Sequence, residues 1–264
     1  MRKSGIYFCP TADMTADEHA KLIQEAGFSS VFTGMGDVVN PLETAEIFAQ
    51  HGLEYETIHA RFNRINHIWF DTEEGEDVER EFLQCVDICA QIGVPILVLH
   101  LSSGEAAPQI TDIGRSRFDR IIERACQKNV KTAFENQRKL ANLSWVLEYY
   151  GTDKNVGFCW DCGHEGCFTP GREYMPLFGD RLMCLHIHDN HCVYNEDEHL
   201  LPFDGTYPFE NFARHIKKSG FQGTLMLETS KGNSPIYADM SYQAYYQKAY
   251  QTTKRLEEMI EAVQ

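Results

Sequence analysis

Side chains that can bind a metal ion stand at or near the ends of six successive apolar or β-branched runs of this sequence. They are His59, His100, Glu135, Asp161, His188 and Glu228. Carboxylates combined with imidazoles suit a divalent ion such as Mn²⁺, Zn²⁺, Fe²⁺ or Co²⁺. Glu135 and Glu228 each follow an apolar run, and burial of a carboxylate is costly unless it is paired or binds metal. We therefore interpret the pattern as a metal site.

Two local motifs add imidazoles to this set. Asp161-Cys-Gly-His164 places a carboxylate and an imidazole three residues apart across a glycine-containing turn, so both side chains are expected to face one ion or one substrate. His186 and His188 share one face of a strand by the two-residue period. We expect only His188, at the strand end, to reach the site, and we interpret His186 as a second-layer or core histidine.

The nine cysteines do not form a recognisable metal or disulfide framework. Cys159-x-x-Cys162 has no second pair at the spacing of a zinc ribbon, so we interpret it as a coincidence. Several other cysteines fall within strand-like or helix-like patterns, where a free thiol behaves as a small apolar residue. We expect reduced cysteines and a cytoplasmic protein.

Short strand-like runs alternate with longer amphipathic segments along the whole chain, which is typical of βαβ units. The expected strands are Gly5–Cys9, Ser30–Thr33, Leu53–His59, Ile96–Leu101, Val130–Glu135, Val156–Asp161, Leu182–His188 and Thr224–Glu228. The expected helices are 15–26, 41–50, 76–92, 118–127, 143–150, 209–218 and a last one from about residue 240. Thr15 and Glu18 form a predicted capping box at the first helix.

Eight such units predict a (β/α)₈ TIM barrel, an α/β fold, as a single domain over residues 1–264. A doubly wound open sheet has the same alternation, but the segment after the first strand, Cys9-Pro-Thr-Ala-Asp-Met, is not the glycine-rich phosphate loop expected there. In a barrel, the six strand ends meet at the carboxyl mouth, where active sites lie.

Composition limits the partners. The net charge of −15 over 264 residues disfavours nucleic acids and anionic membranes, although it leaves room for a local basic site. No apolar run approaches the roughly 18 residues that span a bilayer. We therefore expect no membrane association and no nucleic acid partner, and whether the chain forms a homo-oligomer stays open.

Five stretches together resemble one family. They are Phe134-Glu135-Asn136, Asp161-x-x-His164, His186-x-His188-Asp189, His199-Leu-Leu-Pro-Phe-Asp-Gly205 and Leu227-Glu228. This ordered set is similar to the xylose-isomerase-like TIM-barrel superfamily, which includes sugar epimerases, isomerases, inosose-type dehydratases and apurinic endonucleases. The resemblance implies that Glu135, Asp161, His188 and Glu228 hold one divalent ion, and that Glu135 and Glu228 are also the catalytic acid and base.

The expected activity is a divalent-metal-dependent isomerase or epimerase of a sugar, sugar phosphate or polyol, acting by proton transfer through a metal-stabilised enediolate. His59, His100 and His164 would then orient substrate hydroxyls. A dehydratase of the same fold and a binding module without catalysis are alternatives, although the two glutamates argue against the second.

The endonuclease branch provides a rival hypothesis, a three-metal phosphodiesterase. Its larger ligand set has matches in His59, His100, His164, Asp197 and His199, so these residues are either substrate contacts or additional metal ligands holding up to three ions. Against DNA as substrate, residues 182–213 contain no lysine or arginine, whereas binding a phosphate backbone needs cations.

Other side chains near the expected mouth are candidates for substrate contact. Arg61, Arg64, Arg138 and Lys231 follow strand ends and could hold a phosphate or carboxylate group, or simply be solvated at the rim. Phe62, Trp69 and Phe70 could cover the apolar face of a sugar or pack at the rim.

Overall fold

A computed structural model describes residues 2–38 and 40–264, and it contains eight parallel strands. The strands are β1 (Ser4–Tyr7), β2 (Ser30–Gly34), β3 (Glu54–His59), β4 (Ile96–Leu99), β5 (Lys131–Glu135), β6 (Val156–Asp161), β7 (Leu182–His186) and β8 (Leu225–Leu227). Hydrogen bonds from Ile187 N to Met226 O (2.9 Å) and from Glu228 N to Ile187 O (2.9 Å) connect β7 to β8. The sheet therefore closes into the predicted TIM barrel.

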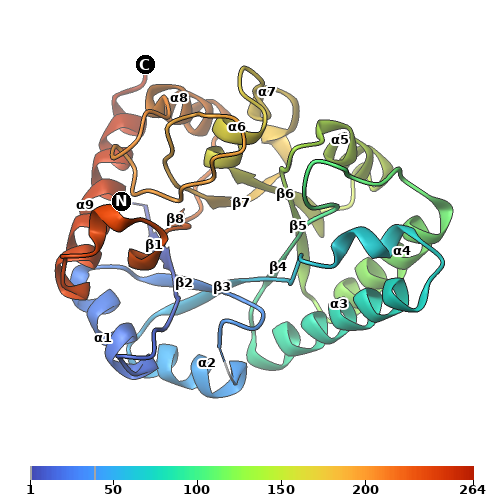
Figure 1. The fold of residues 1–264 in the computed structure, drawn as a ribbon, viewed down its shortest axis with the longest axis horizontal. Helices are drawn as coiled ribbons and strands as arrows, with labels where there is room; N and C mark the ends of the chain where they lie inside the picture. Colours follow the sequence, from blue (N-terminus) through green and yellow to red (C-terminus); the bar gives the residue numbers. More distant parts are fainter. Residues whose placement is uncertain (1, 39) are drawn as a thin grey trace.

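The helices surround the barrel (Figure 1). They are α1 (Ala16–Ala26), α2 (Pro41–Gln50), α3 (Glu73–Ile92), α4 (Asp112–Gln127), α5 (Leu140–Tyr149), α6 (Cys162–Phe168), α7 (Met175–Phe178), α8 (Phe209–Ser219) and α9 (Tyr242–Ala262). Short 3₁₀ turns are η1 (Ile65–Trp69), η2 (Gly179–Arg181), η3 (Lys231–Asn233) and η4 (Pro235–Tyr237). Among the described residues, none of these helices combines the length and apolar character needed to cross a bilayer.

Capping residues decide where several helices begin. The capping box of Thr15 and Glu18 is present at α1, as predicted. Helices α3 and α4 begin earlier than the apolar pattern predicted, because the side chains of Thr72 and Thr111 accept hydrogen bonds from the first turns. The sequence pattern did not predict α6 and α7. A glycine-containing turn was expected after Asp161, but in the structure this segment is the first turn of α6.

The two-residue period of the strands builds the interior of the barrel in layers. Val98, Ala133, Cys159 and Cys184 form a small buried cluster contributed by β4 to β7. Two residues further along the same strands come His100, Glu135, Asp161 and His186. A layer of small apolar side chains therefore underlies a layer of ionisable ones at the carboxyl end of the barrel.

Candidate metal centre

Four ionisable side chains from four adjacent strands converge in this layer: Glu135, Asp161, His186 and Glu228. One ligand atom of each lies within 4.8 Å of those of the others. His186 Nδ1 is 3.0 Å from Glu135 Oε2 and 3.2 Å from Glu228 Oε2. We call these four residues the carboxylate group.

His186 takes the place in this group that the sequence interpretation gave to His188. The sequence interpretation made His186 a second-layer or core histidine, whereas in the structure β7 stops at His186, which pairs with Asp161 in the register between β6 and β7. The side chain of His186 is fully buried, but its Nδ1 faces carboxylates. His188 lies two residues beyond the strand and outside the carboxylate group, although its Nε2 is 3.1 Å from Asp161 Oδ1.

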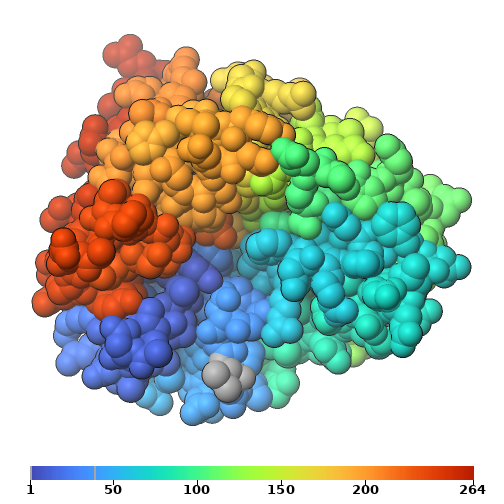
Figure 2. Space-filling model, viewed as in Figure 1, coloured from blue at the N-terminus to red at the C-terminus, as the bar shows by residue number. Residues whose placement is uncertain are grey.

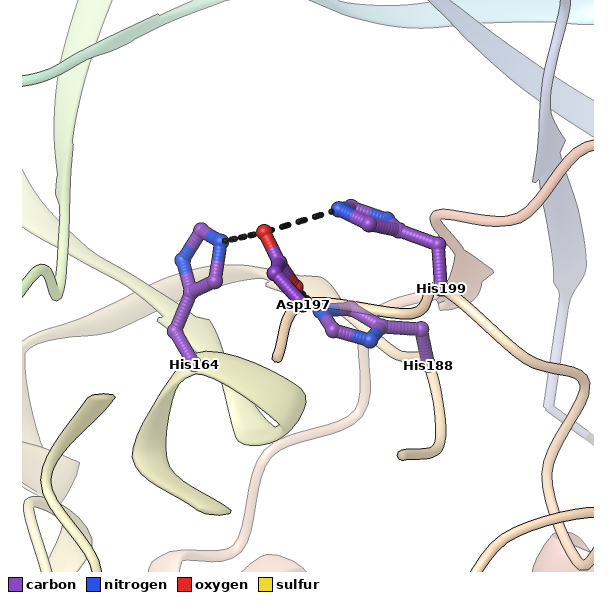
Figure 3. A group of neighbouring side chains, drawn as sticks. All are labelled: His164, His188, Asp197 and His199. Carbon is purple, nitrogen blue, oxygen red and sulfur yellow. Dashed lines mark hydrogen bonds and ion pairs between the residues drawn. The ribbon is translucent and has the colours of Figure 1, made fainter. Parts of the chain in front are cut away.

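His188 belongs to a second group, formed with His164, Asp197 and His199. Figure 3 shows the Asp197 carboxylate between the rings of His164 and His199, with His188 close by. Asp197 Oδ2 is 3.3 Å from His164 Nε2 and 3.2 Å from His199 Nε2. The rings of His188 and His199 stack with centroids 4.0 Å apart. We call these four residues the histidine group.

His59 and His100 contact the carboxylate group through Glu135. Both Nε2 atoms approach Glu135 Oε2, at 3.1 Å for His59 and 3.4 Å for His100, and the two Nε2 atoms are 3.0 Å apart. Glu135 is thus shared, because His164 Nδ1 also lies 2.8 Å from its Oε1. The structure brings together the carboxylates and imidazoles that the sequence suggested for the site, and adds His186.

The imidazoles around the two glutamates lower the pKa of both. Burial by itself would raise the pKa of Glu135, but the imidazoles of His100 and His186, with hydrogen bonds from His100 and His164, hold this pKa well below its ordinary value. For Glu228, burial is again outweighed, chiefly by His186, and the pKa falls to about 2. Both glutamates are therefore carboxylates at neutral pH.

In the histidine group, the negative charge of Asp197 raises the pKa of the neighbouring imidazoles. Burial would lower the pKa of His199, but the hydrogen bond and charge of Asp197 raise it to about 9. The pKa of His164 is also raised well above its ordinary value: burial would lower it, but Asp161 and Asp197 outweigh that effect. Because metal-bound histidines must be neutral, cation binding here would release protons.

Both groups fit a divalent cation by a structural criterion. Asp161 Oδ2, Glu228 Oε2 and His188 Nε2 are buried and make no hydrogen bond of good geometry among the described residues, although His186 Nδ1 lies near Glu228 Oε2 and His188 Nε2 lies near Asp161 Oδ1. An unsatisfied buried carboxylate oxygen is costly unless a cation or donor faces it. Oxygen and imidazole donors together match the Mn²⁺, Zn²⁺, Fe²⁺ or Co²⁺ chemistry inferred from the sequence.

The loop after β7 carries Asp197 and His199 to the site, and buried Asp189 fixes that loop. Asp189 Oδ1 accepts hydrogen bonds from Asn190 N (2.8 Å) and Tyr207 N (2.9 Å). Its Oδ2 accepts from Phe203 N (2.8 Å) and Gly205 N (2.9 Å). No signal in the sequence showed this role beyond the position of Asp189 directly after the histidine motif.

Two cavities meet at the site. One of about 300 Å³ is lined by residues that include Glu135, His164, Asp197 and Arg138, and the other, of about 510 Å³, is lined by residues that include Tyr7, Asp37 and Arg61. His59, Phe62, His199 and Glu228 line both. The face of the molecule seen in Figure 2 is hollowed near its centre, where blue, cyan, orange and red segments meet. A ligand in these cavities would lie against both groups.

The three aromatic residues considered from the sequence differ in their position relative to the cavities. Phe62 is 47% exposed, lines both cavities and stacks on His100 with ring centroids 4.6 Å apart. Trp69 is buried, and its Nε1 donates to Leu101 O at 2.7 Å. Phe70 is exposed but lines neither cavity. Of the three, Phe62 is therefore placed to contact a ligand.

This closed parallel barrel, with its ionisable layer at the carboxyl mouth, defines the chain as a TIM barrel of the kind that builds active sites there. The chain belongs to the xylose isomerase-like TIM barrel family, which it matches over residues 20–256.

The similar proteins agree with this assignment. An uncharacterised protein, y4fM of Sinorhizobium fredii, is 27% identical, with 97% of this chain and 94% of that protein covered. The D-psicose 3-epimerase of Clostridium cellulolyticum H10 has a TM-score of 0.76 at 12% identity, covering 98% of this chain and 99% of that one. A D-tagatose 3-epimerase-like protein has a TM-score of 0.76 at 19% identity, with 98% of both chains covered. At these identities, the structural likeness establishes the fold.

Proposed function

We propose that the protein is a divalent-metal-dependent sugar isomerase or epimerase. The observation that carries the proposal is the pair of glutamates in the carboxylate group. Glu135 and Glu228 approach the same nitrogen of His186, at 3.0 Å and 3.2 Å, and both line the 300 Å³ cavity. Two carboxylates around one ligand cavity are what proton removal and return next to a carbonyl require.

The ion would be held by Glu135, Asp161, His186 and Glu228, and when bound it would polarise the carbonyl and hydroxyl oxygens of the sugar. One glutamate would then remove a proton from the carbon next to the carbonyl and become a carboxylic acid, which can return that proton on the same face. For return on the opposite face, the other glutamate would first take up a proton from water in the cavity. Both are carboxylates before substrate binds, as proton removal demands.

Other residues of the chain would orient the sugar. The Gln137 amide lies 3.1 Å from His100 Nε2 and 3.2 Å from Glu135 Oε1 at the cavity wall, where it can contact a hydroxyl. Phe62 lines the same cavity and offers an apolar face to a sugar.

Similar structures support the sugar as substrate. They include a D-psicose 3-epimerase studied with D-tagatose, a D-allulose 3-epimerase in complex with D-allulose, and a 3-keto-D-glucoside 4-epimerase of E. coli.

The test is proton exchange in deuterated water. The Mn²⁺-loaded protein is incubated with D-allulose, D-tagatose and their 6-phosphates, and nuclear magnetic resonance follows loss of the proton next to the carbonyl. We expect exchange with at least one of them, and a decrease of at least about 100-fold in Glu135→Gln and in Glu228→Gln. The matched control is Glu210→Gln, an exposed carboxylate on α8, which should retain full exchange. Absence of exchange with the whole panel, or wild-type exchange in either glutamate variant, contradicts the proposal.

The histidine group favours a second candidate function, a multinuclear phosphodiesterase. Asp197 with His164 and His199 forms a second set of donors, and His59 with Glu135 and His186 forms a third. Three ions around Glu135 would suit the hydrolysis of a phosphodiester. The cation-free stretch 182–213 makes a small diester a better candidate than DNA.

Metal stoichiometry distinguishes the two candidates. One ion per chain with no hydrolysis of bis(p-nitrophenyl) phosphate supports the isomerase or epimerase. Three ions, with hydrolysis that Asp197→Asn abolishes, would support the phosphodiesterase instead.

A further inference from the structure

The cavity that adjoins both groups contains a single lysine or arginine among its lining residues, Arg138. The other cations considered from the sequence lie elsewhere. Arg64 pairs with Glu81 and Asp77, and Lys231 Nζ donates to Ala238 O at 3.0 Å. Arg61 lines the neighbouring, larger cavity.

The guanidinium group of Arg138 is held in place from two sides. Its Nε donates to Asn195 Oδ1 at 2.7 Å, and its Cζ lies 3.5 Å from the centre of the Phe168 ring. Phe168 in turn stacks on His164, with ring centroids 4.5 Å apart. The position of Arg138 is thus tied to the histidine group through a stack of planar side chains.

Asn195 is itself fixed from both ends. Its Nδ2 donates to Glu105 Oε1 at 2.8 Å, its N donates to Cys167 O at 3.0 Å, and its backbone adopts a φ of 68°, a conformation that asparagine tolerates better than most residues. The acceptor for Arg138 Nε is therefore part of an ordered loop.

The two Nη nitrogens of Arg138 have no hydrogen-bond or ion-pair partner within residues 2–38 and 40–264, although Glu135, Asp197 and Glu228 line the same cavity. Those three carboxylates are already engaged by imidazoles. An arginine with only a structural role would be expected to use its Nη donors within the protein. A stacked, oriented guanidinium with unused donors instead matches the planar, two-point binding of an oxyanion.

We propose that Arg138 binds an anionic group of the substrate, so that the substrate is a sugar phosphate or a sugar acid and not a neutral sugar. The inference rests on the proposed function only in taking this cavity as the substrate site. Phosphate and carboxylate share the chemistry that Arg138 recognises, and they can be distinguished by binding measurements that need no turnover.

The test is calorimetric titration of the Mn²⁺-loaded protein with inorganic phosphate and, separately, with acetate. The variants are Arg138→Met, which keeps an apolar contact to Phe168, and Arg138→Lys, which keeps the charge but not the planar fork. Arg61→Met is the matched control, because Arg61 is the cation of the neighbouring cavity. Metal content must be equal in all four proteins, since the ion also attracts anions.

We expect Arg138→Met to weaken binding of at least one anion by about tenfold or more, Arg138→Lys to recover part of the loss, and Arg61→Met to bind as the wild type does. A larger loss for phosphate identifies a phosphate monoester, and a larger loss for acetate identifies a sugar acid. Equal binding in wild type and Arg138→Met, an equal loss in Arg61→Met, or no binding of either anion to the wild type overturns the inference. Absence of proton exchange with intact Arg138-dependent binding would instead contradict only the proposed reaction.

Discussion

Replacement of His186 should remove the ion from the carboxylate group, whereas replacement of His188 should not. His186→Ala deletes the nitrogen that lies 3.0 Å and 3.2 Å from the two glutamates. Removing a residue that merely supports a metal ligand typically weakens metal binding 10–100-fold. Loss of a direct ligand should therefore weaken binding by at least about 100-fold, or about 2.7 kcal/mol.

His188→Ala leaves all four members of the carboxylate group in place. It removes the contact of 3.1 Å between His188 Nε2 and Asp161 Oδ1, so its effect on that ion should be the one expected of a supporting residue, about tenfold. The two variants should therefore differ by about tenfold or more in affinity for the ion of the carboxylate group.

The assay is competition for Mn²⁺ against a fluorescent chelator, with elemental analysis of the gel-filtered proteins. The matched control is His191→Ala, whose ring pairs with Glu198 at an exposed position and should have no effect. Circular dichroism checks that each variant is folded, because His186 also stacks on Phe32 with ring centroids 4.6 Å apart. A folded His186→Ala that binds Mn²⁺ as the wild type does, beside a His188→Ala that has lost it, would refute the reasoning from strand register.

Three further predictions concern the framework of the site. Asp189→Asn places an amide nitrogen opposite two of the four backbone N–H groups that donate to this carboxylate. The free energy of unfolding, measured with urea, should therefore fall by about 3 kcal/mol. Burial raises the pKa of Glu165 to about 7 from 4.5, so the native state holds this proton more tightly and stability should fall by about 3 kcal/mol as pH rises from 4.5 to 7. Glu165→Gln should flatten that dependence, and an unchanged slope in denaturation series at several pH values would contradict it. Gly163→Ala places a Cβ 2.0 Å from His188 Cε1, so we expect a loss of about 1–3 kcal/mol in unfolding free energy and a disturbed histidine group, and a wild-type thermal midpoint and metal content would count against this.

The sequence alone was sufficient to predict the barrel. Each of the eight expected strands is present within two residues of its predicted bounds, because buried parallel strands leave short apolar runs between amphipathic helices. The pattern also placed Glu135, Asp161 and Glu228 at strand ends on one mouth, because parallel strands of a barrel share a direction. Local capping chemistry, in contrast, shifted the starts of α3 and α4.

The choice between His186 and His188 needed the tertiary structure. Both have the same parity along the chain, so the two-residue period cannot separate them. The register between β6 and β7 sets Asp161 beside His186, and a shift in that register between Phe158 and Cys159 is not visible in the sequence of either strand.

The histidine group was equally beyond local patterns. Asp197 and His199 lie on a long loop whose path depends on four backbone hydrogen bonds to Asp189 and on the bond from His199 Nδ1 to Glu228 O, at 2.7 Å. The family resemblance grouped Asp197 and His199 with His164, but no local pattern in the sequence places them together. Their positions follow from contacts between segments distant in the chain, because a loop without a periodic pattern takes its conformation from the barrel against which it packs.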